Sequence, residues 1–444
     1  MKKLVFTLAV VIVVLLTLAT VLAYSQSLSQ SQINSNENNP AVPTLSPTLS
    51  PTSTLSPTPT ILPTATPFPT STPTPAPTAL PQATGTTTLS QGVNDEEVYS
   101  VVQSADGSNA LAGYTKSYGA GGSDMLLVKT EPRVMQGLPN NPTMNAVMWE
   151  KAYGGLLDDG AKSIVLCSDG GYLLAGFTKS YGSGALDMFL VKTDSNGNLL
   201  WNMTYGGIND DSANSLIQAS DSGYVLAGYT NSNVENQSSW IVKVDSMGIV
   251  QWNIVCCGQA ATSITKTNDG GYALTVEQPN AFELVKLDST GQVQWTQTYP
   301  TPSYCGRAQS VVQAGDGGYA VTGWIMDQSG SNSTWLLKTD STGILQWSKT
   351  YGGLGAYCIV QTNRGGYALT GDRAFVIVTY SAGNVLWNRN YDSLSDPNIA
   401  FTRGYALIQP ATNQYVIAMV QASYGQILRG LQTYVVSISV PLTV

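Results

Sequence analysis

Residues 169–176 read DGGYLLAG, and related segments recur along most of the chain. An Asp-Gly pair supplies the positive φ that a tight hairpin turn needs, and the apolar run after it is typical of a buried strand. The last four spacings between copies are 47 or 48 residues. The position of the tyrosine is held by Asn109, Tyr172, Tyr224, Tyr272, Tyr319, Tyr367 and Tyr415.

Tryptophans form a second landmark in step with the first, and we expect them to be structural residues that dock the repeats. They are Trp149, Trp201, Trp252, Trp295, Trp347 and Trp387. Two landmarks in one register indicate an internal repeat. The second copy reads as four short strands over 163–166, 172–176, 187–192 and 199–201, joined by turns. Four-stranded units of this length are typical of propeller blades.

The number of copies predicts an all-β fold, a seven-bladed β-propeller of four-stranded antiparallel blades, with six or eight blades as alternatives. The last copy ends after 435–438 without its tryptophan strand. Residues 86–91 align with 202–206, which belong to such a strand. We therefore expect the amino-terminal stretch to supply the missing outer strand and close the ring, which hides an exposed sheet edge.

The chain before the repeats divides into two segments. Residues 1–23 hold two lysines and a long uncharged stretch, which predicts a transmembrane anchor or a signal peptide. Residues 24–85 are low in complexity, and 40–81 contain thirteen of the twenty-two prolines, which predicts a disordered Pro/Thr/Ser stalk. Residues 86–444 are then the propeller. We expect it on the extracellular face of the membrane, either anchored or secreted.

Composition excludes several function classes. The chain has no histidine, which removes every Ser-His-Asp or Cys-His arrangement and the commonest metal ligand. The net charge of −8 argues against nucleic acid. We predict no catalytic residue, no metal and no cofactor. The five cysteines show no zinc spacing, so we expect free thiols, with one disulfide among Cys256, Cys257, Cys305 and Cys358 as the alternative.

The segment from Asp194 to Trp201, with its copies, resembles the quinoprotein (PQQ)-like propeller repeat. The wider Tyr-Gly-Gly and Asp-Gly-Gly-Tyr pattern is similar to repeat proteins of prokaryotic cell surfaces, some of which carry glycan-degrading names. The resemblance covers 86–444 and implies the propeller fold. The glycine here lies three residues after the aspartate rather than four. Only the adjacent Cys256 and Cys257 match any part of a quinone site.

A four-strand meander places two kinds of connection on opposite faces of the ring. The connections between second and third strands, and between successive blades, vary in length and carry aromatic and acidic residues. Variable loops on a rigid scaffold are where binding usually occurs. The candidate ligand-binding residues are Tyr118, Tyr181, Asp158, Asp159, Asp210 and Asp211, and the alternative for each loop is a solvated acidic rim.

Two other repeated features have simpler interpretations. Five lysines share one strand position, and we expect each to pair with an aspartate of its own blade, with an anion-binding ring as the alternative. They are Lys129, Lys192, Lys243, Lys286 and Lys338. The sequons at Asn202, Asn236 and Asn332 are N-glycosylation candidates.

These observations favour a recognition or adhesion module that binds a surface protein or a glycan. The alternative is a glycan-active enzyme that uses two carboxylates of the loop face. A quinone-dependent oxidoreductase is the third hypothesis.

Overall fold

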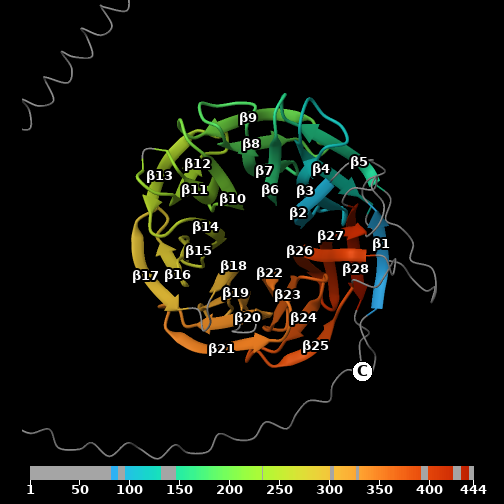
Figure 1. The fold of residues 1–444 in the computed structure, drawn as a ribbon, viewed down its shortest axis with the longest axis vertical. Helices are drawn as coiled ribbons and strands as arrows, with labels where there is room; N and C mark the ends of the chain where they lie inside the picture. Colours follow the sequence, from blue (N-terminus) through green and yellow to red (C-terminus); the bar gives the residue numbers. More distant parts are fainter. Residues whose placement is uncertain are drawn as a thin grey trace, which may run out of the picture. The chain divides into compact units, whose positions relative to one another are not determined.

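The repeats fold into seven antiparallel sheets of four strands arranged as a ring (Figure 1). The structure is a computed structural model that describes residues 82–88, 96–131, 147–232, 234–300, 305–326, 330–391, 399–423 and 432–439. The predicted all-β propeller of seven four-stranded blades is confirmed. Residues 1–23 and the predicted stalk up to residue 81 lie outside the described ranges. Within those ranges, no helix has the length and apolar character needed to cross a membrane.

Successive strands pair within each blade, which gives a simple meander. The first three blades contain β2 (Glu96–Gln103), β3 (Asn109–Thr115), β4 (Asp124–Thr130), β5 (Val147–Tyr153); β6 (Asp159–Leu166), β7 (Tyr172–Thr178), β8 (Asp187–Thr193), β9 (Leu199–Tyr205); and β10 (Asp211–Gln218), β11 (Tyr224–Thr230), β12 (Ser238–Val244), β13 (Val250–Cys256). The next three contain β14 (Ala261–Lys266), β15 (Tyr272–Gln278), β16 (Ala281–Leu287), β17 (Val293–Pro300); β18 (Cys305–Gln313), β19 (Tyr319–Met326), β20 (Asn332–Thr339), β21 (Leu345–Tyr351); and β22 (Ala356–Gln361), β23 (Tyr367–Gly371), β24 (Val376–Thr379), β25 (Val385–Arg389).

The seventh blade is built from both ends of the propeller. It contains β26 (Ile399–Ala411), β27 (Gln414–Ser423) and β28 (Gln432–Ser439), and β1 (Gln82–Thr88) pairs with β28 as its outer strand. Figure 1 shows β1, in blue, beside β28, in red. In this structure β1 therefore occupies the outer-strand position that the sequence predicted for the amino-terminal stretch. The strand starts at Gln82, however, so it begins before residue 86, where the sequence placed the start of the propeller.

The innermost strand of every blade contains a β-bulge at the same place. In β6 the pairing register shifts between Ala161 and Ser163, so Lys162 is the extra residue. The facing residue Gly176 allows this, because a Cβ there would lie 2.0 Å from the Gly160 carbonyl oxygen. Ser163 accepts a hydrogen bond of 3.1 Å from the backbone N–H of Leu216 in the next blade. The bulge thus turns one side chain out of the pleat while its neighbour joins two blades.

The tryptophans lie between blades. Trp347 of β21 packs edge-on against Tyr367 of the next blade, with 6.2 Å between the ring centroids. Below it is Gly383, whose φ is +76° and where an added Cβ would lie 2.8 Å from the tryptophan ring. The hydroxyl of Tyr351 donates 2.6 Å to the Gly383 carbonyl oxygen. The repeated tryptophan, the turn glycine and two tyrosines therefore form one inter-blade joint.

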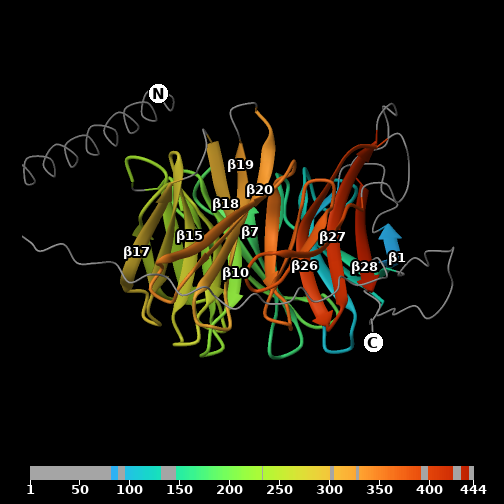
Figure 2. The same ribbon diagram turned by 90° about the horizontal axis from the view of Figure 1, so that it is seen from below.

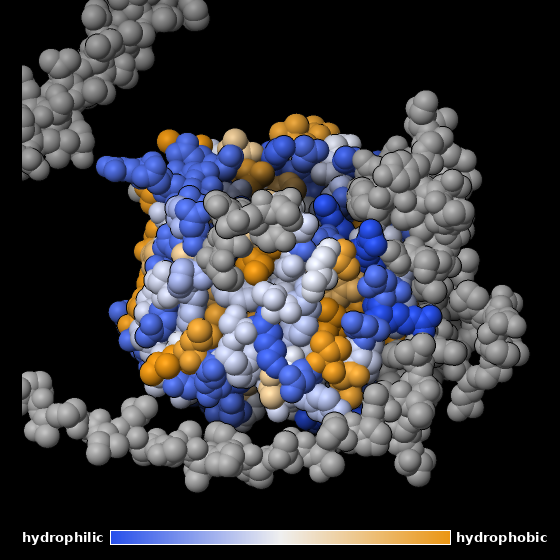
Figure 3. All heavy atoms as spheres, turned by 60° about the horizontal axis from the view of Figure 1, so that its bottom comes forward, coloured by the Kyte–Doolittle hydropathy of each residue, from blue (hydrophilic) through white to orange (hydrophobic). Residues whose placement is uncertain are grey.

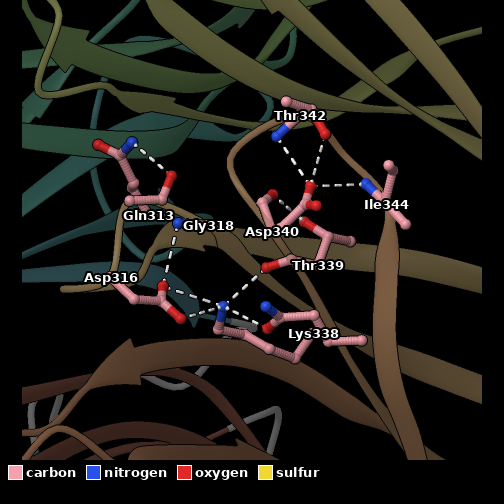
Figure 4. A network of polar contacts seen from close by, with 10 residues as sticks. Gln313, Asp316, Gly318, Lys338, Thr339, Asp340, Thr342 and Ile344 are labelled. Carbon is pink, nitrogen blue, oxygen red and sulfur yellow. Dashed lines mark hydrogen bonds and ion pairs between the residues drawn. The ribbon is translucent and has the colours of Figure 1, made fainter. Parts of the chain in front are cut away.

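The repeated lysines pair with aspartates of their own blades, as predicted. Each reaches from the third strand to the turn between the first two, over distances of 2.7–3.0 Å. Figure 4 shows Lys338, which is almost completely buried, directed at the carboxylate of Asp316. Its amine also donates to the Thr339 carbonyl oxygen at 2.7 Å and to Gln346 at 3.1 Å. These lysines therefore brace turns within single blades.

The hydrophobic core is divided among the joints between neighbouring blades. Each of seven clusters of described residues combines side chains from two adjacent blades. The blades stand side by side around the ring (Figure 2). On the side turned forward in Figure 3, hydrophobic residues form separate patches between hydrophilic ones. The sheets therefore bury their faces against neighbouring sheets, and the surface on this side contains both hydrophobic and hydrophilic residues.

Candidate functional site

A cavity of about 860 Å³ lies among the innermost strands, which Figure 1 places nearest the centre of the ring. All seven blades contribute to its lining, each through the extra residue of its bulge. We call this set the bulge ring: Tyr99, Lys162, Asn214, Thr262, Gln309, Tyr357 and Tyr405. One bulge in each blade thus directs one side chain toward a shared central space.

Three members of the ring, from adjacent blades, form a tyrosine arc. Tyr405 lies between the other two, with ring centroids 5.0 Å from Tyr99 and 5.6 Å from Tyr357. The hydroxyl of Tyr357 donates to Asp372 at 2.7 Å, and that of Tyr99 donates to Glu97. Burial, together with these hydrogen bonds, raises the pKa of both phenols above the ordinary value. The arc is therefore a neutral aromatic wall with fixed ring positions.

The other four members form a polar arc, which consists of Lys162, Asn214, Thr262 and Gln309. Lys162 donates to the Asn214 side chain at 2.8 Å and to Ser212 at 3.2 Å. The Asn214 amide in turn donates to the Ala261 carbonyl oxygen at 2.9 Å. Amide and hydroxyl groups both donate and accept hydrogen bonds, so this side of the cavity suits a ligand rich in hydroxyl groups.

Two ion pairs and a further lysine complete the lining. Asp158 lies 3.0 Å from Lys179, and this hydrogen bond lowers the pKa of the aspartate. Glu277 lies 3.1 Å from Arg307; burial raises the pKa of the glutamate and the arginine opposes that effect. Lys116 also lines the cavity, with its amine 5.7 Å from the centre of the Tyr114 ring. Both acids of the described lining are therefore engaged by cations.

The two tyrosines predicted as ligand anchors lie away from the cavity lining. Tyr118 is half-buried and packs against the hydrophobic cluster between the seventh and first blades. Tyr181 is 45% exposed, donates to the Gly154 carbonyl oxygen at 2.8 Å and lies 5.6 Å from the ring of Phe189. Each therefore has a local structural contact, and ligand binding by them stays a prediction.

In each of the two predicted acidic pairs, the second aspartate is buried and the first is not. Asp158 lines the cavity and Asp210 is exposed. Asp159 is completely buried and accepts hydrogen bonds of 2.7 Å from the Gly155 N–H and the Ser180 hydroxyl. Asp211, also completely buried, accepts equivalent bonds from Gly207 and Ser232. The second aspartate of each pair thus holds the connection between two blades, and ligand contact is open only to the first.

The remaining candidates lie outside the cavity lining. Asn202, Asn236 and Asn332 are exposed, which glycosylation requires. Cys256 and Cys257 are free, with their Sγ atoms 3.2 Å apart at the end of β13. Neither residue is among those that line the cavity, and a quinone role for them stays untested. Cys167 and Cys358 are also free, in agreement with the expectation of thiols at these positions.

Sequence reasoning missed the bulge ring, although a signal for it exists. In four blades the bulge residue stands between an alanine and a serine, as in Ala161-Lys162-Ser163 and Ala213-Asn214-Ser215. The flanking residues repeat because they pack and join blades, whereas the middle residue is tyrosine in three blades and Lys, Asn, Thr or Gln in the other four. A variable residue between repeated ones indicates a position where packing does not require one residue type.

The fold defines this chain as a seven-bladed β-propeller, and solved structures resemble it only at that level. The RRP9 WD40 repeats are 8% identical, with 81% of this chain and 100% of that chain covered at a TM-score of 0.52. The WD40 β-propeller domain of Doa1 is 12% identical, and the match covers 81% of this chain and 97% of that chain at a TM-score of 0.49. Sqt1 from Chaetomium thermophilum is 11% identical, and the match covers 79% of this chain and 86% of that chain at a TM-score of 0.48.

No family model matches the sequence, and no curated protein matches it. Likeness at such low identity concerns the fold alone. The quinoprotein-like character of the repeat therefore stays a prediction.

Proposed function

We propose that this protein is a recognition module that binds its ligand in the central cavity through the bulge ring. The observation that carries the proposal is a difference between neighbouring positions of the innermost strands. The residues on either side of each bulge recur from blade to blade, whereas the bulge residue that faces the cavity varies. Side chains of five types (Tyr, Lys, Asn, Thr and Gln) on a rigid scaffold favour selective binding, with little ordering cost on association.

The chemistry of the lining favours binding over catalysis. A glycan-active enzyme needs one acid that holds a proton and a second that is a free carboxylate. Asp158 and Glu277 are each paired with a cation, and Asp159 and Asp211 are completely buried at the starts of β6 and β10. A tyrosine arc opposite amides and a hydroxyl suits stacking on a sugar ring, and a protein loop with an aromatic tip is the second ligand type that it would accommodate.

The proposed location is the outside of the cell. The support for this proposal is the apolar stretch in residues 1–23 and the proline-rich tract that follows it. In this arrangement the tract is a spacer that holds the recognition module away from the membrane.

The test is a glycan and protein array probed with the purified protein and with a Tyr99→Ala/Tyr405→Ala double variant. We expect the double variant to bind at least tenfold more weakly, because two stacking surfaces are removed. Tyr380→Ala is the matched control. Tyr380 is 41% exposed in the turn between β24 and β25, on the face of the ring opposite to the loops between second and third strands. Ligand binding that survives in the double variant but is lost in Tyr380→Ala would refute the central site.

A further inference from the structure

Lys162 is half-buried, and it differs from the five buried lysines of the blades because the described residues provide no carboxylate for it. The five repeated lysines of the blades each have an aspartate within 3.0 Å. The amine of Lys162 has only neutral partners, namely the Ser212 hydroxyl and the Asn214 side chain, and lies 5.9 Å from the centre of the Phe177 ring. A cation that is partly removed from water and has no counter-ion is disfavoured, and an anionic ligand would supply the missing partner.

We infer that the central cavity selects a carboxylated saccharide, with Lys162 holding the carboxylate and the tyrosine arc stacking on the sugar ring. This inference rests on the proposed function and names its ligand class. The lysine lies on β6, and the arc is supplied by β22, β26 and β2, so the cavity presents a charged group and an aromatic wall together.

The rest of the polar arc explains why the ligand is a saccharide rather than an aliphatic acid. Asn214, Thr262 and Gln309 follow Lys162 around the ring, one from each successive blade. Hydroxyl groups donate and accept hydrogen bonds, as do these amides and this threonine. An aliphatic acid has no hydroxyl groups to bond with these side chains, whereas a sugar acid can add hydrogen bonds to those that they already make. The volume of about 860 Å³ has room for several sugar rings.

The proposed binding of a carboxylate depends on pH, because only the protonated amine of Lys162 is a cation. Burial lowers its pKa to about 8, because the cavity wall disfavours the charged form. The other titratable and charged groups that line the cavity are Tyr99, Tyr114, Tyr229, Tyr357, Tyr405, Lys116 and the ion pairs Asp158–Lys179 and Glu277–Arg307. The charge on Lys162 is present below about pH 8 and is lost above it. If only the charged form binds, affinity falls roughly tenfold per pH unit above the pKa.

The experiment is titration calorimetry of the full-length protein with oligogalacturonates, oligomannuronates and hyaluronan oligomers, each compared with its methyl ester. The ester keeps the sugar ring and removes the charge. We expect at least one acidic oligomer to bind tenfold or more tightly than its ester at pH 6.5, and this preference to disappear at pH 10. Lys162→Met is expected to abolish the preference as well.

Lys266→Met is the matched control, because Lys266 also lies on an innermost strand but is exposed at its other end. It is expected to leave the preference unchanged. Equal binding of acid and ester, or a preference that survives Lys162→Met, would overturn the carboxylate assignment and leave the recognition function standing. Failure of every acidic oligomer would also overturn the assignment. If the arrays yield no cavity-dependent ligand either, the proposed function itself fails.

Discussion

Replacing Trp347 by alanine tests how the blades hold together. The ring packs against Tyr367 of the next blade and covers Gly383, and the amine of Lys349 lies 5.6 Å from its centre. Truncation of a buried tryptophan costs 3–5 kcal/mol. Because Trp347 is only half-buried, we expect a loss of about 3 kcal/mol, the lower end of that range. Circular dichroism should record a lower melting temperature.

A control and a second substitution separate packing from other effects. Leu345→Ala removes a side chain of the same strand that is 49% exposed, and we expect it to cost less than about 1 kcal/mol. Gly383→Ala places a Cβ 2.8 Å from the tryptophan ring at a φ of +76°, so it should destabilise the wild type. Its cost should be smaller in the Trp347→Ala background, where the contact is absent. Equal losses for Trp347→Ala and Leu345→Ala, or strictly additive losses for the pair, would refute the joint.

Three other predictions concern closure, acid stability and the loops. Deleting 82–88 should lower the melting temperature by several degrees because β28 loses its partner, whereas deleting 40–75 should not; equal melting would contradict closure by β1. Partial burial raises the pKa of Asp269, but the hydrogen bonds from Lys286 and Thr267 outweigh it and lower that pKa to about 2. The ionised carboxylate should therefore stabilise the fold fully above pH 4, and this stabilisation should be lost toward pH 2. Asp269→Asn should therefore lower the melting temperature at pH 7 and reduce the loss between pH 4 and pH 2, and an unchanged acid profile would count against the ion pair. Changing Tyr118 and Tyr181 to alanine should reduce melting more than ligand binding if they only pack locally, and a ligand-binding loss without a stability loss would restore them as anchors.

The repeat could be read from the sequence because its signals are local. Asp-Gly turns and the tryptophan position recur at nearly constant spacing, and each reflects a conformation that a few residues determine. The pairing of Lys338 with Asp316 was predictable for the same reason, since both positions recur together in five blades. The missing strand of the last copy indicated that β1 closes the ring.

The cavity could not be read in the same way, because it depends on how seven blades meet. Lys162 and Tyr405 lie far apart in the sequence, and only the closed ring brings their strands around one space. The burial of Asp159 likewise depends on a loop of the same blade, through Ser180. Adjacent acids in a loop looked equivalent in sequence, but the alternation of a strand start directs one inward and one outward.

The central claim is that the bulge ring holds the ligand, and the most direct test is a crystal structure of the protein with the tightest ligand from the array. The account predicts ligand density inside the ring, in contact with Tyr405 on one side and Lys162 or Asn214 on the other. Ligand density confined to the outer strands or to the Asp-Gly turns, with the central cavity holding only water, would contradict it.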